Sequence, residues 1–209
     1  MNFNELKLFI LNRPKLKKLM HRLIIDPKQT APRLWIRLFV NPFFNRRERG
    51  SVIKCSAKLN VSPINSFSLG KSSVIEFYCV IDNAVGNVII GSNTRIGLGS
   101  TLIGPVQIGD NVLLAQNVVV SGMNHSYEDI DIPIANQGYS TDMVTVEEDV
   151  WIGANSVITS GVSIGTHSIV AGGSVVVKSV PPYCVVAGNP ARVIKRYDFS
   201  TKKWLSVNE

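Results

Sequence analysis

The stretch VIIGSNTRIGLGSTLIGPVQIGDNVLLAQNVVV, residues 88–120, repeats one pattern every six residues. Each repeat begins with an aliphatic residue, and its fifth place holds a small or β-branched residue such as Thr94, Ser100 or Val106. A sustained period of six with these residue types predicts a parallel β-helix, in which three repeats form one triangular coil of about 18 residues. The aliphatic side chains then point inward and form a column along the axis. These first places are Ile90, Ile96, Leu102, Ile108, Leu114 and Val120.

The same pattern extends in both directions from this stretch. It returns between Val146 and Val180, and a weaker form begins near Val52. Between Ile81 and Ile90 the spacing is nine residues, so we expect about three extra residues to bulge at one corner. Asparagine recurs at the fourth place, where the chain turns sharply and where Asn tolerates left-handed backbone. These asparagines are Asn93, Asn111, Asn117 and Asn155.

One long segment breaks the period: SGMNHSYEDIDIPIANQGYSTDMV, residues 121–144. It offers no aliphatic residues in step with the coils, so we expect it to leave the solenoid as an extruded loop. It carries His125, and a histidine at the break of a repeat is well placed for proton transfer. The other histidines occupy less informative places, with His21 on a basic helix surface and His167 on an outward turn.

The composition is that of a folded protein with an aliphatic core. The chain has 209 residues, of which 45% are hydrophobic and 8% aromatic. Three scattered cysteines argue against a disulfide framework and predict a reducing compartment, so we expect a cytoplasmic protein. We identify neither a secretory signal nor an apolar run long enough to span a bilayer.

Positive charge is concentrated in residues 1–50, which hold twelve Lys and Arg against three Asp and Glu, while the whole chain has a net charge of +7. Residues 2–25 mix apolar and basic side chains at helical spacing, so we expect short helices divided at Pro14. Two roles stay open and can coexist. The segment covers the first coil of the β-helix, or it rests on an anionic membrane with the aromatic side chains of residues 33–47 in the interface. No reader motif accompanies the charge, so no nucleic-acid partner is expected.

The repeat ends near Val180, where a double proline cannot donate to a strand ladder and redirects the chain. We therefore expect three parts: a basic amphipathic segment 1–50, a β-helix domain 51–197 and a C-terminal tail 198–209. The tail contains FSTKKWLSV, for which we expect a short helix over residues 199–207.

Several motifs together resemble the left-handed β-helix acyltransferases built from hexapeptide repeats. They are the hexads, the loop with Asn124-His125, and the stretches VWIGANSVITSGVSIG, IVAGGSVVVKSVPP and VVAGNPARVIKRY, which together cover roughly residues 69–197. The branch in question comprises the maltose, galactoside and xenobiotic acetyltransferases and the related polysaccharide O-acetyltransferases. The resemblance implies an all-β fold of left-handed coils, a homotrimer, and acetyl-CoA in a groove between neighbouring subunits, with no metal.

The resemblance also implies roles for individual residues. His125 would take the proton of the acceptor hydroxyl, with Asn124 and Trp151 beside the acceptor. Its second ring nitrogen needs a hydrogen-bond acceptor, and the loop carboxylates and backbone carbonyls are all candidates. Relatives carry serine where this chain has Ala154, so a backbone N–H would have to stabilise the oxyanion. The residues expected to hold acetyl-CoA, either by exposing backbone or by meeting phosphates, are Gly153, Ala154, Ala171, Gly172, Lys178 and Arg192.

These roles predict an O-acetyltransferase that moves an acetyl group directly to a sugar hydroxyl. The coils before the loop lack the Asn and Asp with which the galactoside branch holds its acceptor. We therefore expect a cell-envelope or capsular polysaccharide, or its lipid-linked precursor, at the inner membrane face. Two alternatives stay open: an N-acetyltransferase acting on an amino sugar nucleotide, and a non-catalytic trimeric scaffold. A γ-class carbonic anhydrase would need three histidines on neighbouring coils to hold zinc. The chain has three histidines in all, and His21 lies outside the repeats, so the sequence argues against this class.

Overall fold

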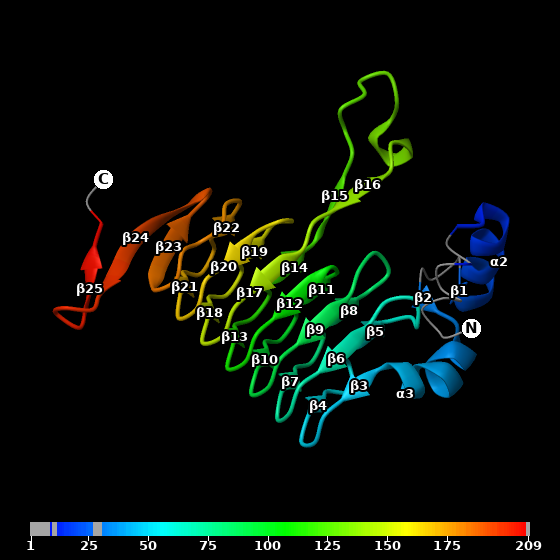
Figure 1. The fold of residues 1–209 in the computed structure, drawn as a ribbon, viewed down its shortest axis with the longest axis horizontal. Helices are drawn as coiled ribbons and strands as arrows, with labels where there is room; N and C mark the ends of the chain where they lie inside the picture. The colour runs from blue at the N-terminus through cyan, green and yellow to red at the C-terminus, as the bar shows by residue number, and fades with distance from the viewer. Residues whose placement is uncertain (1–8, 10–11, 27–30, 208–209) are drawn as a thin grey trace.

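The computed structural model describes residue 9, residues 12–26 and residues 31–207, most of which form a triangular solenoid of parallel strands (Figure 1). Sheet I contains β4 (Val52–Ile53), β7 (Val74–Ile75), β10 (Arg95–Ile96), β13 (Leu113–Leu114), β18 (Trp151–Ile152), β21 (Ile169–Val170) and β23 (Cys184–Gly188). Sheet II contains β5 (Lys58–Asn60), β8 (Val80–Asp82), β11 (Thr101–Ile103), β14 (Val119–Ser121), β19 (Val157–Ile158) and β22 (Val175–Val176). Sheet III contains β3 (Arg46–Arg47), β6 (Phe67–Leu69), β9 (Val88–Ile90), β12 (Val106–Ile108), β17 (Val144–Val146) and β20 (Ser163–Ile164).

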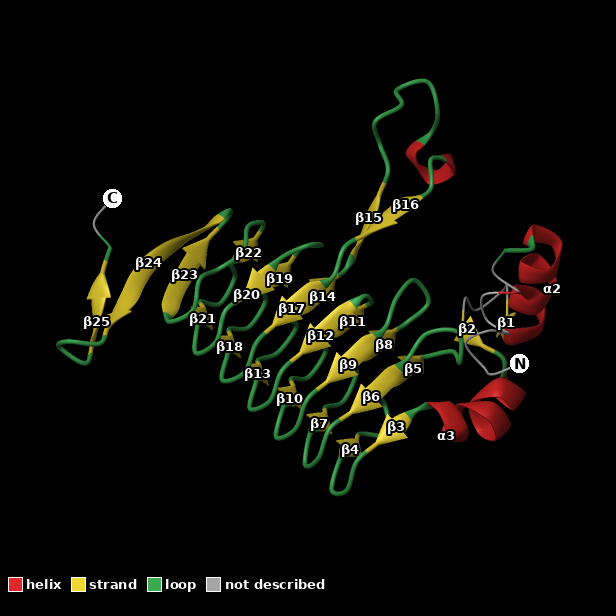
Figure 2. Ribbon diagram, viewed as in Figure 1, coloured by secondary structure: helices red, strands yellow, loops and turns green. Residues whose placement is uncertain are grey.

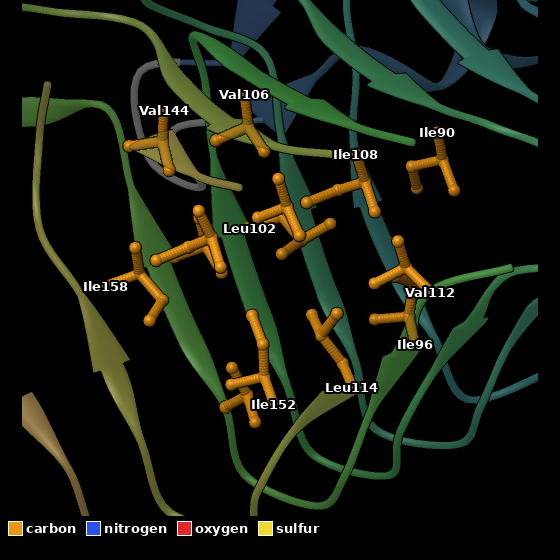
Figure 3. Packing of buried hydrophobic residues seen from close by; sticks show 14 of the residues in the cluster. Ile90, Ile96, Leu102, Val106, Ile108, Val112, Leu114, Val144, Ile152 and Ile158 are labelled. Atoms are coloured by element: carbon orange, nitrogen blue, oxygen red, sulfur yellow. The ribbon is translucent and has the colours of Figure 1, made fainter. Parts of the chain in front are cut away.

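The coils stack in the register that the six-residue period predicts. The Ser92 N–H donates to Asp110 Oδ1 of the next coil, 18 positions along the chain. The residues at the first and fifth places are buried, and Ile96, Leu102 and Ile158 have no exposed surface (Figure 3). The predicted parallel β-helix with an aliphatic core is therefore confirmed.

The corners also follow the sequence. All four asparagines of the fourth place have positive φ, between 54° at Asn93 and 59° at Asn155. The predicted bulge between Ile81 and Ile90 is present, because Ile81 pairs with Leu102, 21 positions along the chain, whereas Ile90 pairs with Ile108, 18 positions along. Asn thus supplies at each of these corners the left-handed conformation that other side chains resist.

The long insertion leaves the solenoid between β14 and β17, as predicted. Ser121 and Val144 remain in the coil strands β14 and β17. Between them β15 (Met123–His125) and β16 (Tyr139–Thr141) pair as an antiparallel hairpin, and the short 3-10 helix η2 (Ile134–Asn136) lies beyond that pair. The hairpin projects away from the coils (Figure 1). The coils on either side of it still stack, because Asn117 Nδ2 donates to Asn155 Oδ1 at 3.3 Å.

Apart from η2 on the hairpin, the described helices gather at one end of the solenoid (Figure 2). They are α2 (Pro14–Ile24), the π-helix η1 (Ile36–Val40) and α3 (Asn41–Phe44), with a small antiparallel pair of β1 (Ile25–Asp26) and β2 (Ala31–Pro32) between them. The predicted break at Pro14 is confirmed as the first residue of α2, whereas most of the expected helix before it lies outside the described residues. Within the described residues, none of the helices is long and apolar enough to cross a bilayer.

The helix expected over residues 199–207 is wrong. After β23 the chain continues as β24 (Ala191–Asp198), which pairs antiparallel with β25 (Lys203–Ser206). The Asp198 carboxylate accepts the backbone N–H groups of Ser200 and Thr201, each at 2.8 Å, and so closes the turn between the strands. The rings of Tyr197 and Trp204 then meet edge to face, 5.4 Å apart across the hairpin. A turn bond and a cross-strand aromatic pair outweigh the weak helical tendency of this segment.

Candidate active site

His125 is the last residue of β15, on the extruded hairpin, and its side chain is exposed. Its Nδ1 lies 3.3 Å from the carbonyl oxygen of Gly138 on the returning strand. A carbonyl can only accept, so Nδ1 carries the hydrogen when this bond forms. The lone pair of Nε2 is then free to take a proton, which is the tautomer that a general base needs.

The loop carboxylates serve the loop rather than the histidine. Glu128 accepts the Tyr127 N–H, and Asp129 accepts the Asp131 N–H, both at 2.9 Å. Gln137 donates to the carbonyls of Asp129 and Ile132, which fixes the shape of the loop. Of the candidates that the sequence left open for Nδ1, the structure selects a backbone carbonyl.

Asn124 and His125 are consecutive in a strand, so their side chains point to opposite faces of the hairpin. The residue directly across from His125 is Tyr139, which is exposed and lies on the same face of the hairpin. Sequence reasoning missed both Tyr139 and the Gly138 carbonyl. The signal that could have found them is the dipeptide Gly138-Tyr139 itself, because a glycine with φ of 93° ends the loop just before the return strand.

Four of the residues expected to hold acetyl-CoA lie together at the edge between sheets I and II. Gly153 and Ala154 follow β18, and Ala171 and Gly172 follow β21. The two turns are in direct contact, since the Gly173 N–H donates to the Ala154 carbonyl at 2.8 Å. A Cβ added at Gly153 would stand 2.4 Å from the Gly172 nitrogen, so this stacking requires glycine.

This edge suits the amide-containing arm of acetyl-CoA. Gly172 and Gly173 are exposed, and a Cβ at Gly173 would meet nothing within 4 Å. Within the described part of the chain, the N–H groups of Ala154 and Gly172 have no hydrogen-bond partner. Free backbone donors on a smooth ridge can bind an amide carbonyl or an oxyanion. The exposed backbone at Ala154 and Gly172 therefore fits the amide-containing arm of acetyl-CoA.

The two basic residues expected at the phosphates lie at different edges. Arg192 lies on β24 opposite Ala187, and the nearby Gly188 N–H donates to Ser174 Oγ at 3.2 Å, so Arg192 extends the edge between sheets I and II. Lys178 follows β22 at the edge between sheets II and III, two coils from the base of the hairpin. Each coil advances about 4.8 Å. In one chain, then, Arg192 lies on the same edge as the Gly153 and Gly172 turns, whereas Lys178 lies on the edge from which the histidine hairpin projects.

Trp151 lies in β18 on the outer surface of sheet I and is 51% exposed. It lines an open cavity of about 400 Å³ with Leu98, Leu113 and the ion pair of Arg95 and Glu76. Among the described residues that line this cavity, none comes from the hairpin. Within one chain the structure therefore does not bring Trp151 to His125.

The described residues contain no group of three or more His, Cys, Asp or Glu side chains that could hold a metal ion. His167 is exposed on a turn with φ of 55° and stacks near Tyr183, with ring centroids 5.8 Å apart. Of the two histidines whose side chains the structure describes, His125 is the one on the extruded hairpin.

Comparison with known proteins agrees with the hexapeptide-repeat fold. The family described as bacterial transferase hexapeptide (six repeats) matches residues 87–122 and 143–178, and the gap in the match is the extruded hairpin. The N-acyltransferase AntD from Bacillus cereus, solved in complex with dTDP and 3-hydroxybutyryl-CoA, superposes with a TM-score of 0.64 at 23% identity. That superposition covers 76% of this chain and 85% of AntD, and it shows a shared fold.

Three curated relatives carry transferase names. Galactoside O-acetyltransferase of Escherichia coli K12 is 38% identical over 56% of this chain and 58% of its own length. 2,3,4,5-Tetrahydropyridine-2,6-dicarboxylate N-acetyltransferase of Brevibacillus brevis is 50% identical over 34% of this chain and 30% of its own length. "Putative lipopolysaccharide biosynthesis O-acetyl transferase WbbJ" of E. coli K12 is 30% identical over 63% of this chain and 82% of its own length. The chain thus spans less than two thirds of the first two relatives and most of the third.

Proposed function

Because this chain belongs to the hexapeptide-repeat transferase family, we propose that it moves an acetyl group from acetyl-CoA to a sugar hydroxyl. The observation that carries the proposal is the contact of His125 Nδ1 with the Gly138 carbonyl, which leaves Nε2 as a free base. A sugar hydroxyl is too weakly nucleophilic to attack a thioester unaided at neutral pH, so such a base is required.

His125 acts twice in this mechanism. Its Nε2 takes the proton of the acceptor hydroxyl while the oxygen forms a bond to the thioester carbonyl carbon. Nε2 then returns the proton to the departing sulfur as the C–S bond breaks, which yields the ester and free CoA. The unpaired N–H of Ala154 is the candidate donor to the oxyanion, because no serine hydroxyl stands in this turn.

The site is completed by a second copy of the chain in a homotrimer. In one chain the hairpin and the cofactor turns lie at different edges of the prism, separated by sheet II. The hairpin also exposes Tyr127, Ile132 and Ile134, and Ile130 is 95% exposed. An apolar surface of this kind favours a partner that covers it. A neighbouring subunit would bring its cofactor edge beside His125.

We assign the acceptor to a cell-envelope or capsular polysaccharide or its lipid-linked precursor. WbbJ, of which 82% of the length is matched, is named for lipopolysaccharide biosynthesis. A lipid-linked acceptor would place the reaction at a membrane, in agreement with the basic and aromatic character of residues 1–50.

N-acetylation of an amino sugar nucleotide is the second candidate, favoured by the 50% identity to an N-acetyltransferase over 34% of this chain. Both reactions use the same base. The acetylated product distinguishes them, because an ester is cleaved by hydroxylamine and an amide is not.

The test is release of free thiol from acetyl-CoA with a panel of sugars, nucleotide sugars and envelope polysaccharides. We expect acceptor-dependent thiol release and a product that hydroxylamine cleaves. A hydroxylamine-resistant product would transfer the assignment to N-acetylation. Absence of acetyl-CoA binding would leave a scaffold and overturn the proposal.

A further inference from the structure

We infer that the outer surface of residues 33–47 is a docking surface for an anionic lipid bilayer. Six large apolar side chains lie exposed on and beside η1 and α3, and the five most exposed of them are hereafter called the aromatic platform. Phe43 is 85% exposed and Phe39 is 70% exposed. A contiguous exposed apolar patch of this kind marks an interaction surface. The platform consists of Leu34, Trp35, Leu38, Phe39 and Phe43.

The platform is held rigidly against the first coil. The Asn41 N–H bonds to the Ile36 carbonyl, five positions back, so the wide turn of the π-helix places both side chains on one face. Ile36 is 2% exposed, and Asn41 is buried and donates to the Val61 carbonyl at 2.8 Å. With this face anchored inward, Leu38 and Phe39 between the two anchors face outward. The exposed rings thus result from a fixed geometry.

The charge around the platform selects an anionic surface. Residues 33–49 contain five arginines and one acidic residue, Glu48, and all five arginines are exposed. Among the described residues, neither Arg37 nor Arg46 has an ion-pair partner. Guanidinium groups beside aromatic rings match the layered chemistry of a bilayer surface, where phosphates lie above the acyl chains. Trp35 suits the boundary between the phosphates and the acyl chains, because its indole ring is amphipathic.

The position of the platform supports the same occupant. It lies at the N-terminal end of the solenoid, and the C-terminal hairpin of β24 and β25 lies at the other end (Figure 1). A bilayer docked there would leave the three sheets and the His125 hairpin accessible. The inference rests on the proposed function only for its purpose, which is to bring the enzyme to a lipid-linked acceptor.

Flotation of the full chain with vesicles tests the inference without acetyl-CoA or acceptor, so its failure is separate from failure of the proposed activity. The vesicles are phosphatidylcholine alone or phosphatidylcholine with phosphatidylglycerol. We expect binding to the mixed vesicles. The double variant Phe39→Ser, Phe43→Ser should bind the mixed vesicles about tenfold more weakly or worse, because it lacks two rings that would be buried in the bilayer. Arg37→Ser should weaken binding about fivefold, and added salt should weaken it further.

The opposite end of the molecule supplies matched controls. Leu205→Ser removes an exposed apolar side chain and Lys202→Ser removes an exposed charge, and both variants should bind like the native chain. Unaltered circular dichroism and melting temperature establish that the platform variants fold. Equal binding by the native chain and the double phenylalanine variant would overturn the inference. So would lipid-free self-association that the same variant abolishes, because the platform would then be an interface between copies.

Discussion

The orientation of His125, the proposed general base, depends on one peptide carbonyl. Gly138 has φ of 93°, a conformation that L-residues other than glycine rarely adopt, and its carbonyl faces the Nδ1 of His125. A Cβ at this position would meet nothing within 4 Å, so any effect of a side chain comes from the backbone and not from a clash. Orientation of the imidazole is thus encoded in a backbone angle.

Gly138→Ala should lower kcat about tenfold or more with little change in KM, because a tilted peptide no longer holds the imidazole in its productive orientation. Steady-state kinetics over a range of acceptor concentrations measure this split. Gly50→Ala is the matched control, since Gly50 also has positive φ, of 75°, but lies in the first coil. A change in KM alone, or an equal loss of kcat in Gly50→Ala, would contradict the orienting role.

Sequence reasoning located His125 because a six-residue period makes its own interruption visible. It could not locate Gly138, 13 positions away, because that contact depends on how the hairpin closes. The four residues expected from motif matching to hold acetyl-CoA, from Gly153 to Gly172, lie close together because adjacent turns stack. It also showed that Trp151 and His125 do not meet in one chain, a fact hidden from any single-chain pattern.

At the level of elements, the C-terminal hairpin shows how a polar turn directs the chain. Asp198 accepts the Ser200 hydroxyl and the backbone N–H groups of Thr201 and Ser200, and these bonds hold the pKa of its carboxyl below the ordinary value. A carboxyl with a lowered pKa in the folded state stabilises the fold above its ordinary pKa. That contribution disappears as the pH falls through the folded value.

Asp198→Ala should therefore speed amide hydrogen exchange in β25 about fivefold at neutral pH, a modest effect because the carboxyl is exposed. Exchange in native β25, corrected for intrinsic rates, should accelerate as the pH falls below the ordinary carboxyl range, and the variant should lose this dependence. Strands β21 and β22 serve as the internal reference. Identical exchange in native and variant β25 would show that the aromatic pair of Tyr197 and Trp204 alone holds the hairpin.

The strands of the coils were predictable and this hairpin was not, for a physical reason. In the coils, each buried position repeats and is supported by the coil above and below, so local pattern and tertiary packing agree. Residues 199–207 have no repeat, and their partner is the strand β24 that precedes them. The sequence therefore determines the solenoid locally but the hairpin only through pairing.

At the scale of the whole molecule, the three-sided prism separates tasks among its edges. The edge between sheets I and II presents free backbone donors, the edge between sheets II and III extrudes the histidine hairpin, and the N-terminal end carries the aromatic platform. The period predicted the prism and its core. The assignment of edges follows only when the coils are wound, because residues 18 positions apart become neighbours.

The central claim is that His125 is the general base, and acetyl transfer by two histidine variants tests it most directly. His125→Asn should lower the rate of acceptor-dependent thiol release by about 10²- to 10⁴-fold while acetyl-CoA still binds. His167→Asn is the control, because His167 is exposed on a turn whose positive φ asparagine accepts. It should keep the native rate. Native activity in His125→Asn, or an equal loss in both variants, would contradict the account.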